Sequence, residues 1–161
     1  MTTATVSERV TAQSEAEVVD AVKTAHGERV PLRIVGRGGW LHAGRPVDAS
    51  RTLDVSRLNG IVEYVPGDLT MTARTGTTLA EIADATAAHR QWLPLDPFGD
   101  PNGTLGATLA TASAGPLGGS IGLPRDVTVG VSYVTGSGDV VRGGGRLGED
   151  VAGFDLLRLT I

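Results

Sequence analysis

The stretch LRIVGRGGWLHAGRP, residues 32–46, decides the fold, because a short strand runs directly into a loop rich in glycine. Residues 32–35 are apolar apart from Arg33 and predict the strand. Three of the four residues 36–39 are Gly, so few side chains keep a ligand away from the backbone. Such loops turn successive N–H groups towards a single point and hold phosphate. Arg37 is expected to add positive charge there.

Two nucleotide-binding motifs do not fit this loop. The dinucleotide fingerprint requires a third Gly where Leu41 stands, followed by a helix that Gly44 and Pro46 prevent. The sequence also lacks the Gly-Lys-Ser/Thr motif of nucleotide triphosphatases. On the chemistry of the loop alone, a tight turn that binds nothing remains an equal alternative.

A second stretch, NGTLGATLATASAGPLGGSIG at residues 102–122, is composed mostly of small residues. Residues 104–115 contain nothing larger than Leu, so the backbone there can approach a partner closely. A flat ligand or a diphosphate is one such partner. Close helix packing and a linker are the alternatives that the residues leave open.

Two capping boxes predict helices. Ser14 opens the first helix, which Gly27 is expected to end, and Thr78 opens the second. The second helix is predicted to turn four apolar residues inward: Leu79, Ile82, Ala83 and Ala87.

Short strands are predicted between and after these helices. Their expected ranges are 52–54, 61–65 and 69–73 around a turn at 66–68, and 127–133 with a return at 140–142. The three glycines at 143–145 predict a flexible break. Alternating helices and hairpins indicate an α+β fold, in one domain with two lobes at about residues 1–95 and 96–161.

The composition excludes several classes of site. The chain has 161 residues, a formal net charge of -4 and no Cys, which excludes disulfides, thiolate metal sites and iron–sulfur ligation by these residues. The charge does not indicate a nucleic-acid surface. No signal peptide and no run of about 18 apolar residues is found. We expect a cytoplasmic protein with no nucleic-acid partner, peripheral to the membrane only through another subunit.

Residues suited to catalysis are sparse. The three histidines have no Cys or carboxylate at metal-ligand spacing, so no metal site is predicted. The nucleophile motif Gly-x-Ser-x-Gly is missing as well. Asp96, Asp126 and Asp155 are candidate general bases, but their positions favour capping of backbone amides or support of turns. Catalytic residues therefore stay unassigned.

Taken in order, these segments resemble the flavin-binding, PCMH-type domain of FAD-linked oxidoreductases of the vanillyl-alcohol-oxidase type. Residues 32–46 are similar to the first FAD loop of that family, and residues 95–122 to the second. The segment VAGFDL at 151–156 is similar to its Val-Ala-Gly-Tyr-Asp-Leu segment. The likeness covers about residues 14–160. Within the family it is greatest to the FAD-binding subunits of bacterial glycolate oxidase, with D-lactate dehydrogenases next.

The resemblance implies FAD as the cofactor and oxidation of a 2-hydroxy acid, glycolate- or lactate-like, by hydride transfer from its α-carbon to flavin N5. It also implies a partner, an iron–sulfur or other electron-transfer subunit. It assigns FAD binding to residues of the two loops, namely Gly36, Arg37, Gly38, Gly39, Trp40, Gly44, Pro97, Gly103, Thr104, Leu105, Gly106, Ala107, Gly115 and Gly122.

The sequence departs from the family pattern at several places. Trp40 stands where related loops have a small or polar residue or the His of covalent FAD, and Ala107 stands where Gly is common. Glu149 and Asp150 replace Lys-Asn or Lys-Asp. The family continues with a further FAD-contacting turn and a substrate-binding cap domain beyond the length of this sequence. We therefore expect a PCMH-type domain incomplete at its C-terminus, and the alternative is a non-catalytic remnant or partner subunit without a substrate site.

Overall fold

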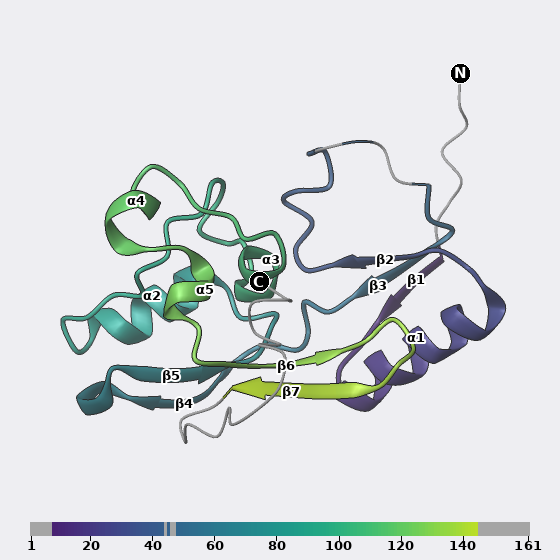
Figure 1. Cartoon of the computed structure of the whole chain (residues 1–161), viewed down its shortest axis with the longest axis horizontal. Helices are drawn as coiled ribbons and strands as arrows, with labels where there is room; N and C mark the ends of the chain where they lie inside the picture. Colours follow the sequence, from purple (N-terminus) through teal and green to yellow (C-terminus); the bar gives the residue numbers. More distant parts are fainter. Residues whose placement is uncertain (1–7, 44, 46–47, 145–161) are drawn as a thin grey trace.

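The computed structural model describes residues 8–43, 45 and 48–144 (Figure 1). In chain order the elements are β1 (Glu8–Thr11), α1 (Glu15–Glu28), β2 (Leu32–Val35), β3 (Arg51–Asp54), β4 (Ile61–Val65), the 3₁₀ turn η1 (Pro66–Asp68), β5 (Thr70–Ala73), α2 (Leu79–Ala87), α3 (Leu105–Ala110), α4 (Gly118–Ile121), α5 (Pro124–Val127), β6 (Gly130–Val134) and β7 (Val140–Gly144). Helices and strands mix along the chain, and the α+β prediction is confirmed.

A parallel sheet of three strands carries the first loop. Its order is β1-β3-β2, so β3, the last of the three strands in the chain, lies between the other two. Arg9, Thr52 and Arg33 are partners in one row across the sheet, and Leu53 on the central strand is fully buried. Helix α1 lies beside this sheet (Figure 1). A parallel sheet of this kind needs such a crossover helix between β1 and β2.

Helix α1 begins as predicted but ends later. The Ser14 hydroxyl accepts a hydrogen bond from the Glu17 N–H at 3.2 Å, which satisfies a free amide of the first turn. The prediction that Gly27 ends the helix was wrong. Helix α1 continues to Glu28, and Arg29 adopts the left-handed conformation with φ 56°. The Arg29 N–H bonds to the carbonyls of the last turn, and this takes over the role expected for the glycine.

Helix α2 shows the predicted capping box between Thr78 and Glu81. Its buried residues are Ile82 and Thr86, one turn apart, so the prediction of Ala83 and Ala87 as inward-facing was wrong. The Thr86 hydroxyl donates to the Ile82 carbonyl at 3.0 Å, and this bond makes a polar residue tolerable on the buried face. A pattern of apolar residues alone could not reveal a threonine satisfied within its own helix.

Two antiparallel hairpins follow, β4–β5 and β6–β7. The first matches the prediction, with a register shift between Ile61 and Glu63. The strand predicted at residues 127–133 is present as β6, but its predicted start was wrong, because Val127 ends helix α5 and β6 starts at Gly130. Pro124 opens that short helix, and the Asp126 carboxylate accepts from the Leu123 N–H at 2.8 Å.

The flexible break predicted at residues 143–145 was also wrong for its first two positions. Gly143 and Gly144 belong to β7 and pair with β6. A Cβ on Gly144 would collide with the Val129 carbonyl, so glycine permits the close pairing there. The third glycine of the run lies outside the described residues.

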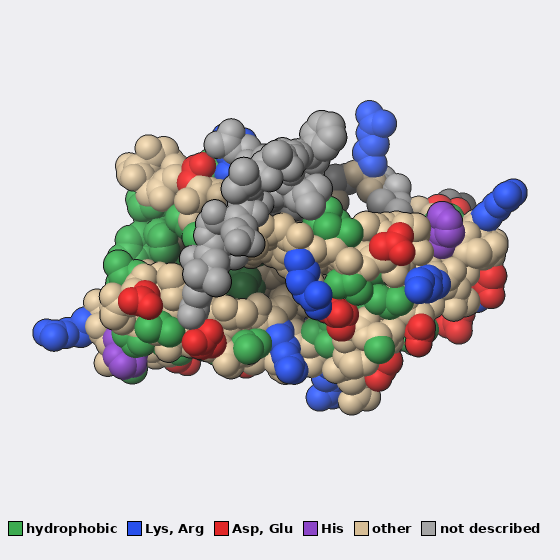
Figure 2. Space-filling view, turned by 60° about the horizontal axis from the view of Figure 1, so that its bottom comes forward, with side chains coloured by type: hydrophobic (Ala, Val, Ile, Leu, Met, Phe, Trp, Pro, Cys, Tyr) green, Lys and Arg blue, Asp and Glu red, His purple; other side chains and the backbone are tan. Residues whose placement is uncertain are grey.

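Backbone hydrogen bonds join α2 to the turn that opens α3. Thr78 and Thr104 form an isolated antiparallel bridge, and the Leu105 N–H donates to the Thr77 carbonyl at 2.8 Å. These bonds cross the lobe boundary predicted near residue 96, which stays a prediction. Among the described residues, no helix is long and apolar enough to cross a membrane. On the face seen in Figure 2, acidic and basic side chains alternate without a continuous basic stripe.

Candidate functional site

The loop after β2 presents a row of backbone donors. The Leu41 N–H bonds to the Gly38 carbonyl at 3.2 Å and the Ala43 N–H to the Trp40 carbonyl at 3.0 Å, so two turns shape the loop. Gly38 has φ +78°, which favours glycine. The N–H groups of residues 37–40 have no hydrogen-bond partner among the described residues. Four successive amides without a partner among the described residues are available to an anion, as in the nests that bind phosphate.

Two glycines of this loop have different surroundings. A Cβ on Gly39 would meet no atom of the described residues within 4 Å, so the backbone there is open with respect to them. A Cβ on Gly36 would lie 2.5 Å from the Thr104 Oγ1. The start of the first loop therefore touches the residue that opens α3, and the two segments predicted to bind FAD adjoin one another.

The second segment is a packed helix start. Thr104 is 2% exposed and its hydroxyl accepts from the Ala107 N–H at 3.3 Å, which caps α3. A Cβ on Gly106 would collide with Thr75, and the Gly106 N–H donates to the Thr75 carbonyl at 2.8 Å. A Cβ on Gly115 would lie 2.5 Å from the Asp96 carbonyl oxygen. Glycine is thus required here by contacts within the chain.

Trp40 reaches from the first loop to another segment. Its ring atoms Cζ2 and Nε1 lie 3.8 Å from the position that a Cβ would take on Gly99. Gly99 has φ +109°, a conformation that other residues rarely adopt. The bulk of Trp40 therefore covers a glycine of the chain, while 40% of the residue stays exposed.

Arg37 faces two carboxylates. Hydrogen bonds from the Thr78 N–H and hydroxyl lower the pKa of Glu81, and the positive charge of Arg37 lowers it further. Hydrogen bonds from the Asn102 N–H and side chain lower the pKa of Asp100, where Arg37 contributes in the same way. The expectation that Arg37 supplies charge to a phosphate stays a prediction. In this structure its positive charge also interacts with the carboxylates of Glu81 and Asp100.

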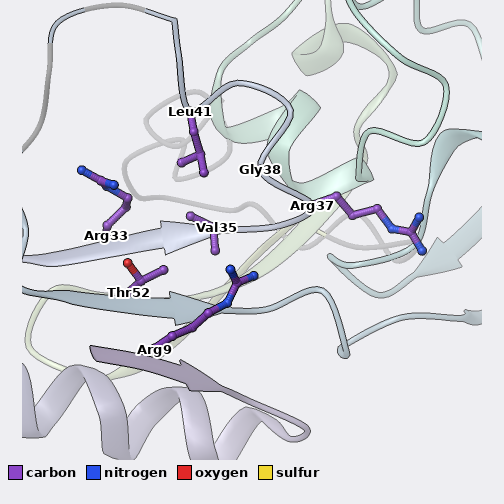
Figure 3. Close-up of a pocket in the computed structure, with 7 residues that line it drawn as sticks. All are labelled: Arg9, Arg33, Val35, Arg37, Gly38, Leu41 and Thr52. Carbon is purple, nitrogen blue, oxygen red and sulfur yellow. The ribbon is translucent and has the colours of Figure 1, made fainter. Parts of the chain in front are cut away.

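A cavity of about 320 Å³ lies on the sheet side of the loop (Figure 3). It is lined by Arg9, Arg33, Val35, Arg37, Gly38, Leu41 and Thr52. Arg9 forms an ion pair with Asp54 at 2.5 Å, which offsets its charge. Figure 3 shows the Arg37 side chain extending away from Arg33 and Thr52. Gly38 borders the cavity, so the loop is open on this side too.

The remaining predicted residues are placed as follows. Leu105 and Ala107 lie in the first turn of α3, and the Gly103 N–H bonds to the Asp100 carbonyl at 2.7 Å. Pro97 borders a groove of about 450 Å³ beside α2, and Gly122, with φ +92°, lies against Asp126. Gly44 and the segment 149–156 lie outside the described residues. FAD contact at each predicted position stays a prediction.

Two candidate bases have structural roles. The Asp96 carboxylate accepts from the Leu117 N–H at 2.8 Å, and the Asp126 carboxylate accepts from the Leu123 N–H at 2.8 Å. The interpretation of both as amide caps is confirmed. Asp155 lies outside the described residues.

Sequence reasoning missed three residues that border the site: Thr75, Gly99 and Asp100. The stretch DPFGDPNG at 96–103 is rich in turn-forming residues, and this was the available signal for an ordered turn. No pattern in the sequence pointed to the contact between Gly106 and Thr75, because it joins residues far apart in the chain.

The chain is similar in sequence to known FAD-linked proteins. The model of a family described as "FAD binding domain" matches residues 7–144. The glycolate oxidase subunit GlcE of Escherichia coli (strain K12) is 38% identical over 146 residues, which cover 89% of this chain and 41% of that protein. The subunit GlcD of Bacillus subtilis (strain 168) is 33% identical over 134 residues, covering 83% and 28%. The chain thus spans less than half the length of these relatives.

A solved structure of alkyldihydroxyacetonephosphate synthase superposes with a TM-score of 0.75 at 26% identity, covering 95% of this chain and 28% of that one. The free amides at residues 37–40 and the open space over Gly39 fit the diphosphate of FAD, because a nest of N–H groups binds phosphate. The fold, the family match and the two relatives lead to one assignment: the chain belongs to the PCMH-type FAD-binding domain family of the FAD-linked oxidoreductases.

Proposed function

We propose that this chain is the FAD-binding domain of an oxidoreductase that oxidises a 2-hydroxy acid, glycolate- or lactate-like. The observation that carries the proposal is the row of free N–H groups at residues 37–40 beside the capped start of α3. The names of the two glycolate oxidase subunits support the substrate class. Bound FAD would accept a hydride at flavin N5 from the α-carbon of the acid.

Each loop has its own part in holding the cofactor. Gly38 and Gly39 would let the diphosphate reach the amides of the first loop. Thr104 and the turn that follows it would offer the cofactor a fixed surface. The Thr104 hydroxyl and the neighbouring amides are already hydrogen-bonded within the chain. In this proposal the chain binds and orients the cofactor.

Four carboxylates on the segments around the two loops favour a second candidate, a flavin-binding domain without a complete substrate site. Glu81, Asp96, Asp100 and Asp126 each accept hydrogen bonds from backbone N–H groups. The lowered pKa values of Glu81 and Asp100 make them poor bases at neutral pH. In this reading the chain is a partner subunit or non-catalytic remnant, and another domain or chain supplies the base.

The proposed partner is an electron-transfer subunit, iron–sulfur or of another type. These 161 residues contain no Cys, so an iron–sulfur cluster that accepts electrons from the flavin would be ligated by residues outside them. Both relatives are named as subunits, which supports an assembly of several chains. We propose the cytoplasm as the location of that assembly.

A titration with FAD and an anaerobic reduction test both candidates. The purified chain should retain flavin absorbance after gel filtration, at about one FAD per chain. Glycolate, D-lactate or D-2-hydroxyglutarate should then bleach that absorbance if the chain completes a substrate site. Bleaching by dithionite alone would support the second candidate, and a chain that stays colourless with excess FAD would refute both.

A further inference from the structure

The indole ring of Trp40 joins two segments far apart in the sequence. Its Cζ2 and Nε1 atoms lie 3.8 Å from the Cβ position of Gly99, at van der Waals distance. A larger residue at position 99 would be strained at φ +109°, and its Cβ would meet the ring at ordinary van der Waals distance. The ring therefore lies beside the Gly99 backbone.

A second contact holds the other end of the same loop. Gly36 lies so close to Thr104 that a Cβ would approach the hydroxyl oxygen to 2.5 Å. Thr104 is 2% exposed and caps α3, so it offers a fixed surface. The four free N–H groups lie between these two contacts. The loop is thus held at both ends while its amides stay available.

The charge of Arg37 also draws the first loop towards the part of the chain that contains Glu81 and Asp100. Glu81 and Asp100 are each fixed by their own hydrogen bonds, from the Thr78 N–H at 2.7 Å and from the Asn102 N–H at 2.7 Å. Both carboxylates belong to the part of the chain that the loop approaches, and Arg37 attracts both. This attraction is screened by salt, because all three side chains are exposed.

We propose that Trp40 is a positioning residue: its ring, seated on Gly99 while Gly36 rests on Thr104, latches the first loop against the second segment and so fixes the gap into which FAD binds. The inference rests on the proposed FAD site for its consequence in binding. The latch itself exists in the protein without FAD. It assigns Trp40 a contact with the protein itself.

Hydrogen exchange of the FAD-free protein tests the latch directly. Trp40→Ala should raise exchange of the Leu41 and Ala43 amides, the two hydrogen-bonded N–H groups of the loop, while the rest of the chain keeps its protection. Trp92→Ala is the matched control, because Trp92 is 62% exposed and lines the groove beside α2. Unchanged exchange in the loop of Trp40→Ala would overturn the proposal. If Trp40→Ala fails to fold, Trp40→Phe and Trp40→Leu carry the same test with smaller losses of contact.

FAD kinetics test the consequence. Loss of the ring should raise the FAD dissociation rate about tenfold, as for truncation of an aromatic anchor, with a smaller change in the association rate. Trp40→Phe should recover most of the loss, and Trp92→Ala should bind as the wild type does. Equal dissociation rates for Trp40→Ala and wild type would refute the latch while leaving FAD binding intact. A wild type that binds no FAD would refute the proposed function, and the exchange experiment would still decide the latch.

Discussion

The two glycine-rich segments look alike in the sequence and differ in the structure. In the first loop a Cβ on Gly39 would meet nothing, and the neighbouring N–H groups have no partner among the described residues. In the second segment Cβ atoms on Gly106 and Gly115 would collide with Thr75 and Asp96, whose carbonyls accept the two glycine N–H groups. The first loop is open to a ligand at Gly39, whereas the second segment is closed by the protein itself at Gly106 and Gly115.

The difference shows that a glycine indicates close approach of the backbone to a partner, but its presence in the sequence does not identify that partner as a ligand or as another part of the chain. In the second segment the partner is another part of this chain, which was the packing alternative left open by the sequence. Any contact that this segment makes with FAD comes in addition to that packing. Substitution of individual glycines distinguishes an open segment from a packed one. In the open segment a larger residue should lower FAD affinity, and in the packed segment it should lower the stability of the fold.

The largest effect is expected for Gly106→Val. The new side chain would overlap Thr75 at the start of α3 and break the packing against the turn before α2. We expect a loss of about 3 kcal/mol in the free energy of unfolding, as for severe overpacking. Urea denaturation followed by circular dichroism measures it. Wild-type stability in this variant would mean that the second segment is as open as the first.

The next effect concerns the Arg9–Asp54 ion pair in the sheet that carries the first loop. Burial alone would raise the pKa of Asp54, but hydrogen bonds from Arg9 and Ser56 outweigh it and hold the pKa below its ordinary 3.8. The ionised carboxylate therefore stabilises the fold above that value, and the contribution is lost as the pH falls through the lowered pKa. Asp54→Asn should cost about 2 kcal/mol at pH 7.

The pH dependence distinguishes this ion pair from simple packing. The stability difference between wild type and Asp54→Asn should be constant from neutral pH down to about pH 5 and should shrink in stronger acid. Thermal unfolding over that range measures the difference. A difference that persists unchanged at pH 2 would show that the charge of Asp54 contributes nothing.

Gly39→Val tests the open side of the comparison. The fold should be unaffected, since a Cβ at this position meets no atom of the described residues within 4 Å, and FAD affinity should fall about tenfold, or 1.4 kcal/mol. Gly136→Val is the matched control, because its Cβ also meets nothing and it lies in the turn between β6 and β7. Isothermal titration with FAD measures both. Equal affinities would mean that the first loop is only a turn.

The smallest effect should be a gain. Gly27 lies inside α1, its Cβ position is free, and it has no positive φ. Gly27→Ala should therefore raise the free energy of unfolding by about 0.5–1 kcal/mol, since alanine loses less backbone entropy in a helix. Denaturant unfolding measures the change. A loss instead would mean that Gly27 ends the helix in solution, as its type had suggested.

The sequence predicted the local elements well where side chains act on their own backbone. Thr78 with Glu81 predicted α2, and the turn at 66–68 predicted the first hairpin. The predicted end of α1 was wrong because Arg29, beyond Gly27, adopted the left-handed conformation that usually requires a glycine.

Long-range contacts set the limit for the site. The order of residues predicted the two loops, and the structure brings them together through Gly36 and Thr104. The partners Thr75 and Gly99 could not be predicted, because close packing between distant segments leaves no period or motif in a single sequence. The same limit hid the role of Trp40, whose contact surface is a glycine with no side chain to signal it.

The strand order β1-β3-β2 has a consequence for the chain as it leaves the ribosome. Neither β1 nor β2 has a neighbour in this sheet until Arg51–Asp54 has been synthesised and slides between them. During that interval two unpaired strands are exposed, which is the state in which nascent proteins associate wrongly. The pairing of β2 with β3 closes the loop between them, whereas its contacts with Gly99 and Thr104 can form only after those later residues have been synthesised.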